Sequence, residues 1–200
     1  MNVQPVVLTG QWVRLEPLEE RHAADLIEAA DYEEIWRYMP TPLQQPEQLH
    51  QWIKDTLELQ RTGTILPFAI IELSSGKAVG STRYLDIRPK DRGLEIGWTW
   101  LTPRVWRTSV NTECKLMLLR HAFETLDAIR VQIKTDKRNT RSRQAIERIG
   151  GQFEGILRQH IALRDGTFRD SAYYSILHTE WPQVKQNLLV KLEPAQAIAS

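Results

Sequence analysis

The order of hydrophobic and polar residues predicts a chain that begins with helices, continues as a run of strands and closes with a hairpin. In the helical segments apolar residues recur three and four positions apart, as on the buried face of an amphipathic helix. Prolines mark several boundaries, because proline starts a helix easily and cannot continue one. The expected helices are Leu18–Ala30, a short turn at Ile35–Met39 stopped by Pro40 and Pro42, Pro46 to about Gly63, about Ser109 to Leu126, about Arg141 to Ile149, and a C-terminal helix that Pro182 opens.

The remaining apolar segments have the length and pattern of strands. Polar turns at Ser74–Lys77 and Arg164–Gly166 join two neighbouring pairs into hairpins, and one helix separates two further strands as in a strand–helix–strand crossover. The expected strands are Gln11–Glu16, which Pro17 ends, Leu66–Leu73, Ala78–Asp86, Leu94–Leu101, Ile129–Thr135, Gln152–Leu163 and Thr167–Leu177. The order predicts a mixed α+β architecture, and the Ala- and Gln-rich last residues are expected to fray.

The size of the chain predicts one domain over residues 1–200, because 200 residues with 42% hydrophobic content suffice for one core and are few for two. The 26 basic and 25 acidic residues nearly cancel, and no block of like charge interrupts the chain. This balance gives nucleic-acid binding little support. The densest basic run, Lys134–Arg143, is read more simply as a solvated loop than as a phosphate-facing edge.

Cysteine usage and terminal pattern indicate a cytoplasmic protein. Cys114 is the only cysteine, so no internal disulfide forms and a reducing compartment fits. Leu116 and Leu118 share its helical pattern, which favours a buried thiol over a nucleophile. The N-terminus lacks the pattern of a signal peptide, and no apolar run reaches membrane-spanning length. The histidines have no metal-ligand spacing, so we expect no metal.

The stretch Gly93–Gly155 contains two places where a strand passes through a polar turn into a helix. The N–H groups at a helix start attract anions, so two such passages suggest a ligand that carries phosphate. In the first passage Thr108 or Ser109 is the expected N-cap, and Asn139 is the expected N-cap in the second. The first turn also contains Arg104, Arg107 and Asn111. These groups exceed what a cap needs, so we favour a pyrophosphate cradle there.

Four segments follow one another in a specific order. They are LEIGW (94–98), WRTSVNTE (106–113), RNTRSRQAIERIG (138–150) and FEGILR (153–158), between VRLEPL near the start and YSILHTEW near the end. Together they resemble the GNAT superfamily of acyl-CoA-dependent N-acyltransferases, and within it the Rim-type branch of ribosomal-protein N-terminal acetyltransferases. The resemblance implies a GNAT-like fold with a central, mostly antiparallel sheet of about seven strands flanked by helices. It also implies acetyl-CoA as donor and a primary amine as acceptor.

The resemblance assigns roles to residues of this chain. The strand Glu95–Leu101 would splay and pair with the pantetheine arm of the cofactor, with one N–H facing the acyl oxygen. Glu95 would be the base or position a water, and Ser142 would donate a hydrogen bond to the leaving thiolate. The implied cofactor-binding residues are Trp98, Trp100, Leu101, Arg104, Trp106, Arg107, Thr108, Ser109, Val110, Asn111, Thr112, Asn139 and Ser142. For at least one of Trp98 and Trp100, packing in the core or cleft is the favoured role.

Three positions depart from the family pattern. Arg107 and Ser109 stand where the pyrophosphate loop usually has glycines, so this loop must keep its shape with side chains present. Ile146 stands where many members have a tyrosine that protonates the thiolate. Cofactor affinity and the identity of the acid are therefore the properties that these departures affect.

Several alternatives stay open from the sequence. Glu95 could instead be a surface or salt-bridged residue, and His160 and Asp170 are weaker candidates for the base. Trp36, Tyr38 and Met39 either pack in the core or line an acceptor pocket. The acceptor is a protein N-terminus or a small-molecule amine; the rival functions are transfer of another acyl group such as succinyl and non-catalytic sensing of acyl-CoA. Sheet edges or the C-terminal hairpin could support a homodimer.

Overall fold

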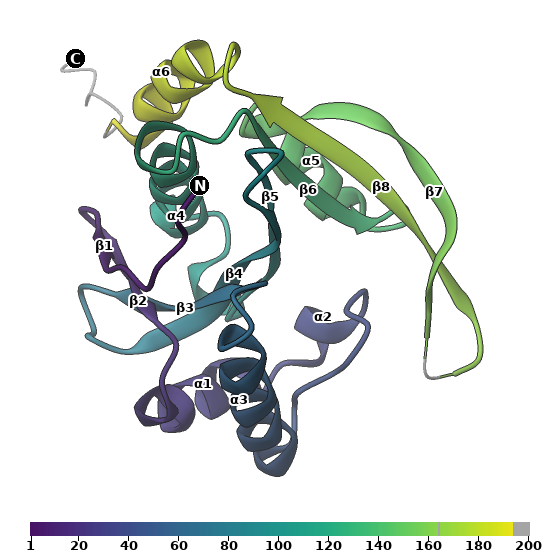
Figure 1. Ribbon diagram of the computed structural model, residues 1–200. Helices are drawn as coiled ribbons and strands as arrows, with labels where there is room; N and C mark the ends of the chain where they lie inside the picture. Colours follow the sequence, from purple (N-terminus) through teal and green to yellow (C-terminus); the bar gives the residue numbers. More distant parts are fainter. Residues whose placement is uncertain (164, 194–200) are drawn as a thin grey trace, which may run out of the picture.

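The computed structural model describes residues 1–163 and 165–193, and a single mixed sheet forms its centre (Figure 1). Its strands are β1 (Leu8–Thr9), β2 (Val13–Pro17), β3 (Leu66–Glu72), β4 (Ala78–Arg88), β5 (Gly93–Leu101), β6 (Arg130–Asp136), β7 (Gln152–Ala162) and β8 (Phe168–Leu177). Their order across the sheet is β1-β2-β3-β4-β5-β6-β8-β7. Neighbours are antiparallel except β5 and β6, which run parallel as the predicted crossover requires.

Helices cover both faces of this sheet. They are α1 (Ala23–Ala30), α2 (Glu33–Trp36), α3 (Pro46–Gln60), α4 (Ser109–Arg120), α5 (Thr140–Arg148) and α6 (Trp181–Leu192). Figure 1 shows α1 and α3 together below the sheet and α4 beside α6 above it, while β7 and β8 project as a long hairpin. None of the helices within residues 1–163 and 165–193 has the length and apolarity needed to cross a membrane.

A hydrophobic core lies on each face of the sheet, between the sheet and the helices that cover it, and β3 contributes to both cores. Phe68 and Ile70 point into the core formed with α4, α5 and α6, whereas Ala69 and Ile71 point into the core formed with α1 and α3. The alternation follows from the two-residue period of a strand, and it explains why β3 reads as a continuous apolar run. Cys114 on α4 is fully buried in the first core, as the sequence predicts, and burial raises the pKa of its thiol to about 11.

Several predicted boundaries are corrected by the structure. The first helix begins at Ala23 after a 3-10 turn, because Leu18 still donates its N–H to the Pro67 carbonyl oxygen at 3.0 Å, beside β3. The helix expected to reach Leu126 changes after Arg120 into a π-helical turn. The eighth strand, β1, has two residues and no periodicity of its own, since only pairing with β2 defines it. The prediction about the last residues falls on 194–200, outside the described residues.

The parallel pairing of β5 with β6 is short, and this opens the sheet. The two strands pair only from Gly93 to Glu95, opposite Arg130 to Gln132. On its other side β5 stays beside β4, but the register shifts between Ser81 and Arg83, and Trp98 takes a left-handed φ of 50°. Such a bulge bends a strand. In the described chain the part of β5 beyond Glu95 therefore has no strand partner on the β6 side, as a splayed strand requires.

A buried carboxylate near the end of β2 predicts how the fold responds to acid. Glu16 accepts hydrogen bonds from Arg14 (2.6 Å), Arg21 (2.7 Å) and His22 (3.2 Å). Burial alone would raise the pKa of Glu16, but these hydrogen bonds lower it to about 2. A depressed pKa stabilises the folded state above the unfolded value of 4.5, and this contribution is lost as the pH falls toward 2.

We expect Glu16→Gln to remove about 1–2 kcal/mol of this pH-dependent stability, a modest figure because solvent screens the half-exposed arginines. Denaturant unfolding of both proteins at pH 3 and pH 7 measures the effect. The difference between them is expected to be larger at pH 7. Glu19→Gln serves as the control, because Glu19 also accepts from Arg21 but is exposed. Equal pH dependence of wild type and Glu16→Gln would contradict the assignment.

Candidate active site

Glu95 is the last residue of β5 that pairs with β6, and it points to the sheet face opposite α5. Its neighbours Leu94 and Ile96 enter the core with α4 to α6, so Glu95 must face the other way. Only 1% of Glu95 is exposed. Its Oε2 accepts from Lys134 Nζ at 2.9 Å and from Gln132 Nε2 at 3.0 Å. One oxygen of this carboxylate is thereby fixed at the point where β5 and β6 separate.

The second oxygen of Glu95 lies over Gly97. A methyl group on Gly97 would stand 3.0 Å from Glu95 Oε1 and 2.9 Å from the Leu85 side chain. Glycine is therefore what lets the carboxylate lie along β5 toward the bulge. Among the described residues no hydrogen-bond donor reaches Oε1. The carboxylate has one anchored oxygen and one oxygen available to a ligand.

The surroundings of Glu95 raise its affinity for a proton. Burial raises the pKa of Glu95 above its ordinary value, against the opposing effect of Lys134 and Gln132. Burial would lower the pKa of Lys134, but the carboxylate of Glu95 outweighs it and raises that pKa. Glu95 is thus salt-bridged, one of the alternatives left open by the sequence. A carboxylate with a raised pKa is also a better base at neutral pH.

The first helix start is capped by Thr108. Its Oγ1 accepts from the Val110 N–H at 3.3 Å and donates to the Val105 carbonyl oxygen at 2.7 Å, which decides between the two predicted caps. Arg107, one residue earlier, has a left-handed φ of 62°. This is the conformation for which glycine is favoured, so the family's glycine preference at this position has a backbone cause. Ser109 and Asn111 lie in the first turn of α4, where backbone N–H groups lack intrahelical partners.

The backbone of Arg107 predicts opposite results for two substitutions. Arg107→Gly and Arg107→Ala remove the same charge, but only glycine adopts the left-handed region without strain. We expect Arg107→Gly to be more stable than Arg107→Ala by about 1 kcal/mol in denaturant unfolding. Equal stability of the two variants would show that the loop relaxes out of this conformation.

Three other residues of the predicted cradle are engaged by protein partners. Arg104 pairs with Glu72 at 2.8 Å, and Thr112 Oγ1 accepts from Arg148 at 2.9 Å. Trp106 Nε1 donates to the carbonyl oxygen of Leu101 at 2.8 Å. Their side chains hold the turn against the sheet and against α5. The Arg148 contact joins α4 to α5, and no local pattern in the sequence signals it.

The second helix start is capped by Asn139, as predicted. Asn139 Oδ1 accepts from the Ser142 N–H at 3.0 Å. The Ser142 side chain is half-buried in the first turn of α5, and its hydroxyl has no hydrogen-bond partner among the described residues. Ile146 is buried in the core, so the helix presents no tyrosine at that position. Thr140 and Ser142 are the two hydroxyl side chains in the first turn of α5.

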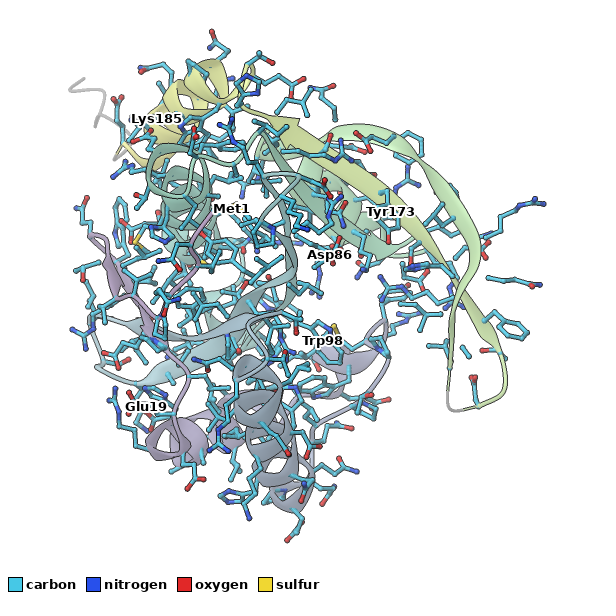
Figure 2. All side chains as sticks on the ribbon, viewed as in Figure 1. Met1, Glu19, Asp86, Trp98, Tyr173 and Lys185 are labelled. Carbon is cyan, nitrogen blue, oxygen red and sulfur yellow. The ribbon has the colours of Figure 1, made fainter. Side chains whose placement is uncertain are left out.

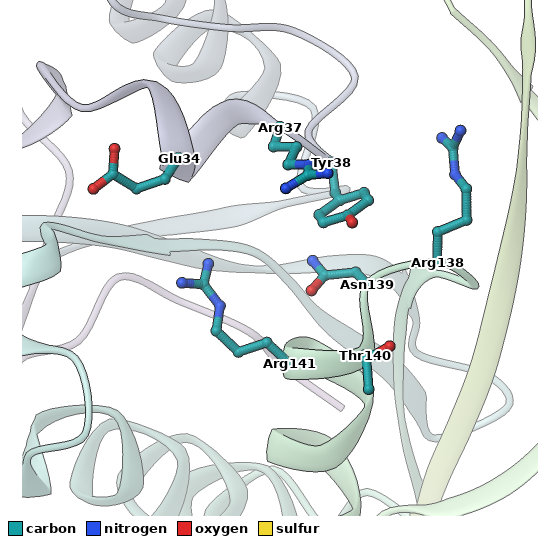
Figure 3. Close-up of a pocket in the computed structure, with 7 residues that line it drawn as sticks. All are labelled: Glu34, Arg37, Tyr38, Arg138, Asn139, Thr140 and Arg141. Atoms are coloured by element: carbon teal, nitrogen blue, oxygen red, sulfur yellow. The ribbon is translucent and has the colours of Figure 1, made fainter.

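A pocket of about 260 Å³ lies between the segment around α2 and the start of α5 (Figure 3). Figure 3 shows Tyr38 and Asn139 facing one another across it, with Arg141 reaching toward the side of Glu34. Arg141 also lies 3.8 Å from the centre of the Trp106 ring, so it connects the pocket to the first helix start. The lining residues are Glu34, Arg37, Tyr38, Arg138, Asn139, Thr140 and Arg141.

Some of the aromatic residues in this region are buried in the core, and others stay partly exposed. Trp100 is buried and packs on Trp36 with ring centres 5.4 Å apart, and Trp36 donates to the Ala30 carbonyl oxygen. Met39 packs against the same core. Trp98, which Figure 2 labels, is half-buried at the bulge, and its ring centre lies 4.9 Å from the guanidinium carbon of Arg83. Trp98 is therefore the tryptophan of β5 that stays partly exposed.

Lys115 is a buried cation that sequence reasoning missed. Its Nζ donates to Thr99 Oγ1 at 2.7 Å, and Thr99 shares a hydrogen bond with Thr82 at 2.8 Å. Burial lowers the pKa of Lys115. The contact ties α4 to β5 just beyond the bulge and helps to fix the splayed strand. A lysine in a helix is normally expected to be exposed, so only the fold reveals that Lys115 is buried.

The weaker candidates for the base have structural partners. His160 bonds Ser171 at 3.0 Å and Tyr173 at 3.2 Å, and Asp170 pairs with Lys137 at 2.6 Å. Asp170 also accepts from the Gln159 N–H at 2.7 Å, where the backbone of β7 is left-handed. Both side chains therefore stabilise the β7–β8 hairpin. In the described part of the chain no group of three or more His, Cys, Asp or Glu side chains could hold a metal.

The comparisons with known proteins agree with this architecture. A family model described as an acetyltransferase (GNAT) domain matches residues 13–152. The chain therefore belongs to the GNAT acetyltransferase family. The structure of a GCN5-related N-acetyltransferase from Brucella melitensis superposes with a TM-score of 0.89 and 31% identity, over 96% of this chain and 87% of that one.

Two further relatives concern the branch within the family. "Putative ribosomal N-acetyltransferase YdaF" of Bacillus subtilis is 32% identical over 54% of this chain, and the match spans 58% of that protein. Mycobacterium smegmatis RimJ, solved in complex with CoA-disulfide, superposes with a TM-score of 0.81 over 94% of this chain and 95% of its own, at 23% identity, which shows a shared fold. The name of the Bacillus subtilis relative agrees with the resemblance to the Rim-type branch, and the likeness to RimJ shows the fold alone.

Proposed function

We propose that this acetyltransferase moves the acetyl group of acetyl-CoA directly to a primary amine. The observation that carries the proposal is the placement of Glu95. Its carboxylate is buried at the fork between β5 and β6, with Oε2 held by Lys134 and Gln132 and Oε1 directed over Gly97. An available carboxylate oxygen beside an unpaired strand edge suits a site where an amine loses a proton.

The two helix starts suit the donor. The first turn of α4 offers N–H groups near Ser109 and Asn111, and Arg107 stands at its entrance, a combination that favours a pyrophosphate. Among the described residues no strand pairs with the edge of β5 around Trp98 to Trp100 on the side of β6, which suits an amide-bearing arm such as pantetheine. Asn139 and Ser142 stand at the start of α5, across the opening, where the arm would end. Because Arg104 and Thr112 already have protein partners, we assign them to shaping this cradle.

The proposed chemistry is a direct transfer. Glu95 accepts a proton from the amine, whose nitrogen bonds to the thioester carbon. The carbon–sulfur bond then breaks, the leaving thiolate takes a proton from solvent water, and Glu95 returns its proton to the solvent. The Ser142 hydroxyl would stabilise that thiolate by a hydrogen bond. An alkyl ammonium has a pKa of ~10.4, so little of the amine is neutral at neutral pH and the reaction needs a group that accepts its proton. Positioning the two reactants contributes about 7–11 kcal/mol, more than the base alone.

Release of free thiol from acetyl-CoA tests this function. The purified protein is incubated with acetyl-CoA and a panel of acceptors, half of them peptides with free N-termini and half small primary amines. We expect thiol release to depend on one class of amine. Tight binding of acetyl-CoA without thiol release from any amine would instead support an acyl-CoA sensor.

A further inference from the structure

Arg83 on β4 is a buried cation that the proposed reaction does not use. Only 6% of it is exposed. Its guanidinium carbon lies 5.4 Å from the centre of the Trp52 ring and 4.9 Å from that of Trp98, so it sits between two indoles. Its Nη2 has one long contact of 3.5 Å with Thr56 Oγ1, and its buried Nε has no hydrogen-bond partner.

The charge of Arg83 is not compensated by the protein. Within residues 1–163 and 165–193, no carboxylate lies within 4.0 Å of its nitrogens, although the other ion pairs of the chain satisfy that distance. Burial lowers the pKa of Arg83 to about 10, and no neighbouring carboxylate opposes this. Buried charges in proteins are normally paired, because stacking on aromatic rings recovers only part of the lost hydration. Such a guanidinium suits an anion that arrives with a ligand.

The position of Arg83 links it to the proposed reaction. Arg83 stands directly across from Gly97 in the β4–β5 ladder, and Leu85 stands across from Glu95. Residues opposite one another on paired strands point to the same face, so Arg83 and Glu95 share one face of the sheet, where the Leu85 and Glu95 side chains lie against Gly97. The bulge at Trp98 interrupts the ladder beside Arg83. The two side chains therefore flank one glycine-lined stretch of β5.

We propose that Arg83, whose guanidinium lies between the Trp52 and Trp98 rings, binds a carboxylate group of the substrate. A guanidinium presents parallel N–H donors that match the two oxygens of a carboxylate. The indole walls favour a carboxylate on a short hydrocarbon segment. The inference rests on the proposed function and narrows it. The carboxylate can come from the acceptor, as in an acidic amino acid, or from the free end of a dicarboxylic acyl group such as succinyl.

Paired substrates distinguish the two sources. In one arm the protein acetylates glutamate and glutamine side by side; in the other it transfers succinyl or butyryl to one neutral amine. We expect Arg83→Met to lower kcat/KM for the carboxylate-bearing member of one pair by roughly 10- to 100-fold, and to leave the neutral member unchanged. Arg83→Lys keeps the positive charge but lacks the parallel N–H donors of a guanidinium. Its kcat/KM for the carboxylate-bearing substrate should therefore lie between those of the wild type and Arg83→Met. Arg92→Met, which removes an exposed arginine, is the control for charge loss.

A binding measurement separates this proposal from the reaction itself. Millimolar glutarate should raise the thermal unfolding midpoint of the wild type and of Arg92→Met, and should not raise that of Arg83→Met or should raise it much less. If glutarate acts in this way while no amine releases thiol, the carboxylate site stands and amine transfer is wrong. If amines are acylated but Arg83→Met changes neither the substrate ratios nor the glutarate effect, the carboxylate site is wrong.

Discussion

Glu95→Gln is expected to lower kcat for amine acetylation by about 10²-fold or more, while the Kd for acetyl-CoA stays nearly unchanged. The substitution preserves size and hydrogen bonding but removes the oxygen that can accept a proton over Gly97. Because burial raises the pKa of Glu95, the wild-type rate should rise with pH as this carboxyl ionises, and the variant should lack that rise. Steady-state rates across pH, with acetyl-CoA binding by calorimetry, measure both effects.

Asp86→Asn is the matched control for this prediction. Asp86 also accepts from Gln132 Nε2 at 3.0 Å, but it is exposed and lies outside the fork. Removing its charge should change kcat less than about threefold. If Asp86→Asn and Glu95→Gln lost activity equally, the rate would depend on the negative charge of the acidic side chains in general, and not on a proton accepted by the Glu95 oxygen. A fully active Glu95→Gln variant would mean that Glu95 is not the base and that the proton leaves the amine through a chain of water molecules.

Glu113→Ala is expected to lower the free energy of unfolding by about 3–5 kcal/mol, the largest stability loss that we predict for one side chain. The buried Glu113 carboxylate on α4 accepts three backbone N–H groups, from Gln11 (2.6 Å), Trp12 (2.8 Å) and Val13 (2.8 Å). Alanine leaves all three without their partner. Urea unfolding measures the loss.

Glu113→Gln serves as the comparison for this stability prediction. It retains one acceptor oxygen and should lose about half as much. Gly10 is involved as well, since a methyl group there would lie 2.3 Å from Glu113 Cδ. Because these contacts fix α4 against β2, both variants should also weaken acetyl-CoA binding in proportion to the stability lost. An alanine variant as stable as the wild type would mean that water replaces the carboxylate without cost.

Local patterns predicted the elements that local chemistry determines. The sequence predicts Asn139 as one cap and either Thr108 or Ser109 as the other, because a polar residue before an apolar helical pattern has few other uses; Asn139 and Thr108 have that role. The crossover between β5 and β6 followed from one helix separating two strands. The eighth strand was missed, because β1 exists only through pairing with β2.

Contacts between segments that are distant along the chain could not be predicted from the sequence. Lys134 lies 39 residues from Glu95, and the pairing of β5 with β6 brings them together. The indole pair around Arg83 comes from α3 and β5, and a single arginine in an apolar strand gives no signal of it. The contact of Arg148 with Thr112 likewise depends on how α4 and α5 cross. Residue type and spacing predict which residues form a cradle, but only the fold shows which of their side chains already have protein partners.

The most direct test of the account follows both products of one reaction. The wild-type protein is mixed with acetyl-CoA and the best acceptor amine, and free thiol and acetylated amine are quantified together over time. Direct transfer with Glu95 as the base predicts that the two products appear one for one, and that Glu95→Gln slows both equally. Thiol released without acetylated amine, or acetyl-CoA bound tightly and left intact with every amine, would contradict it.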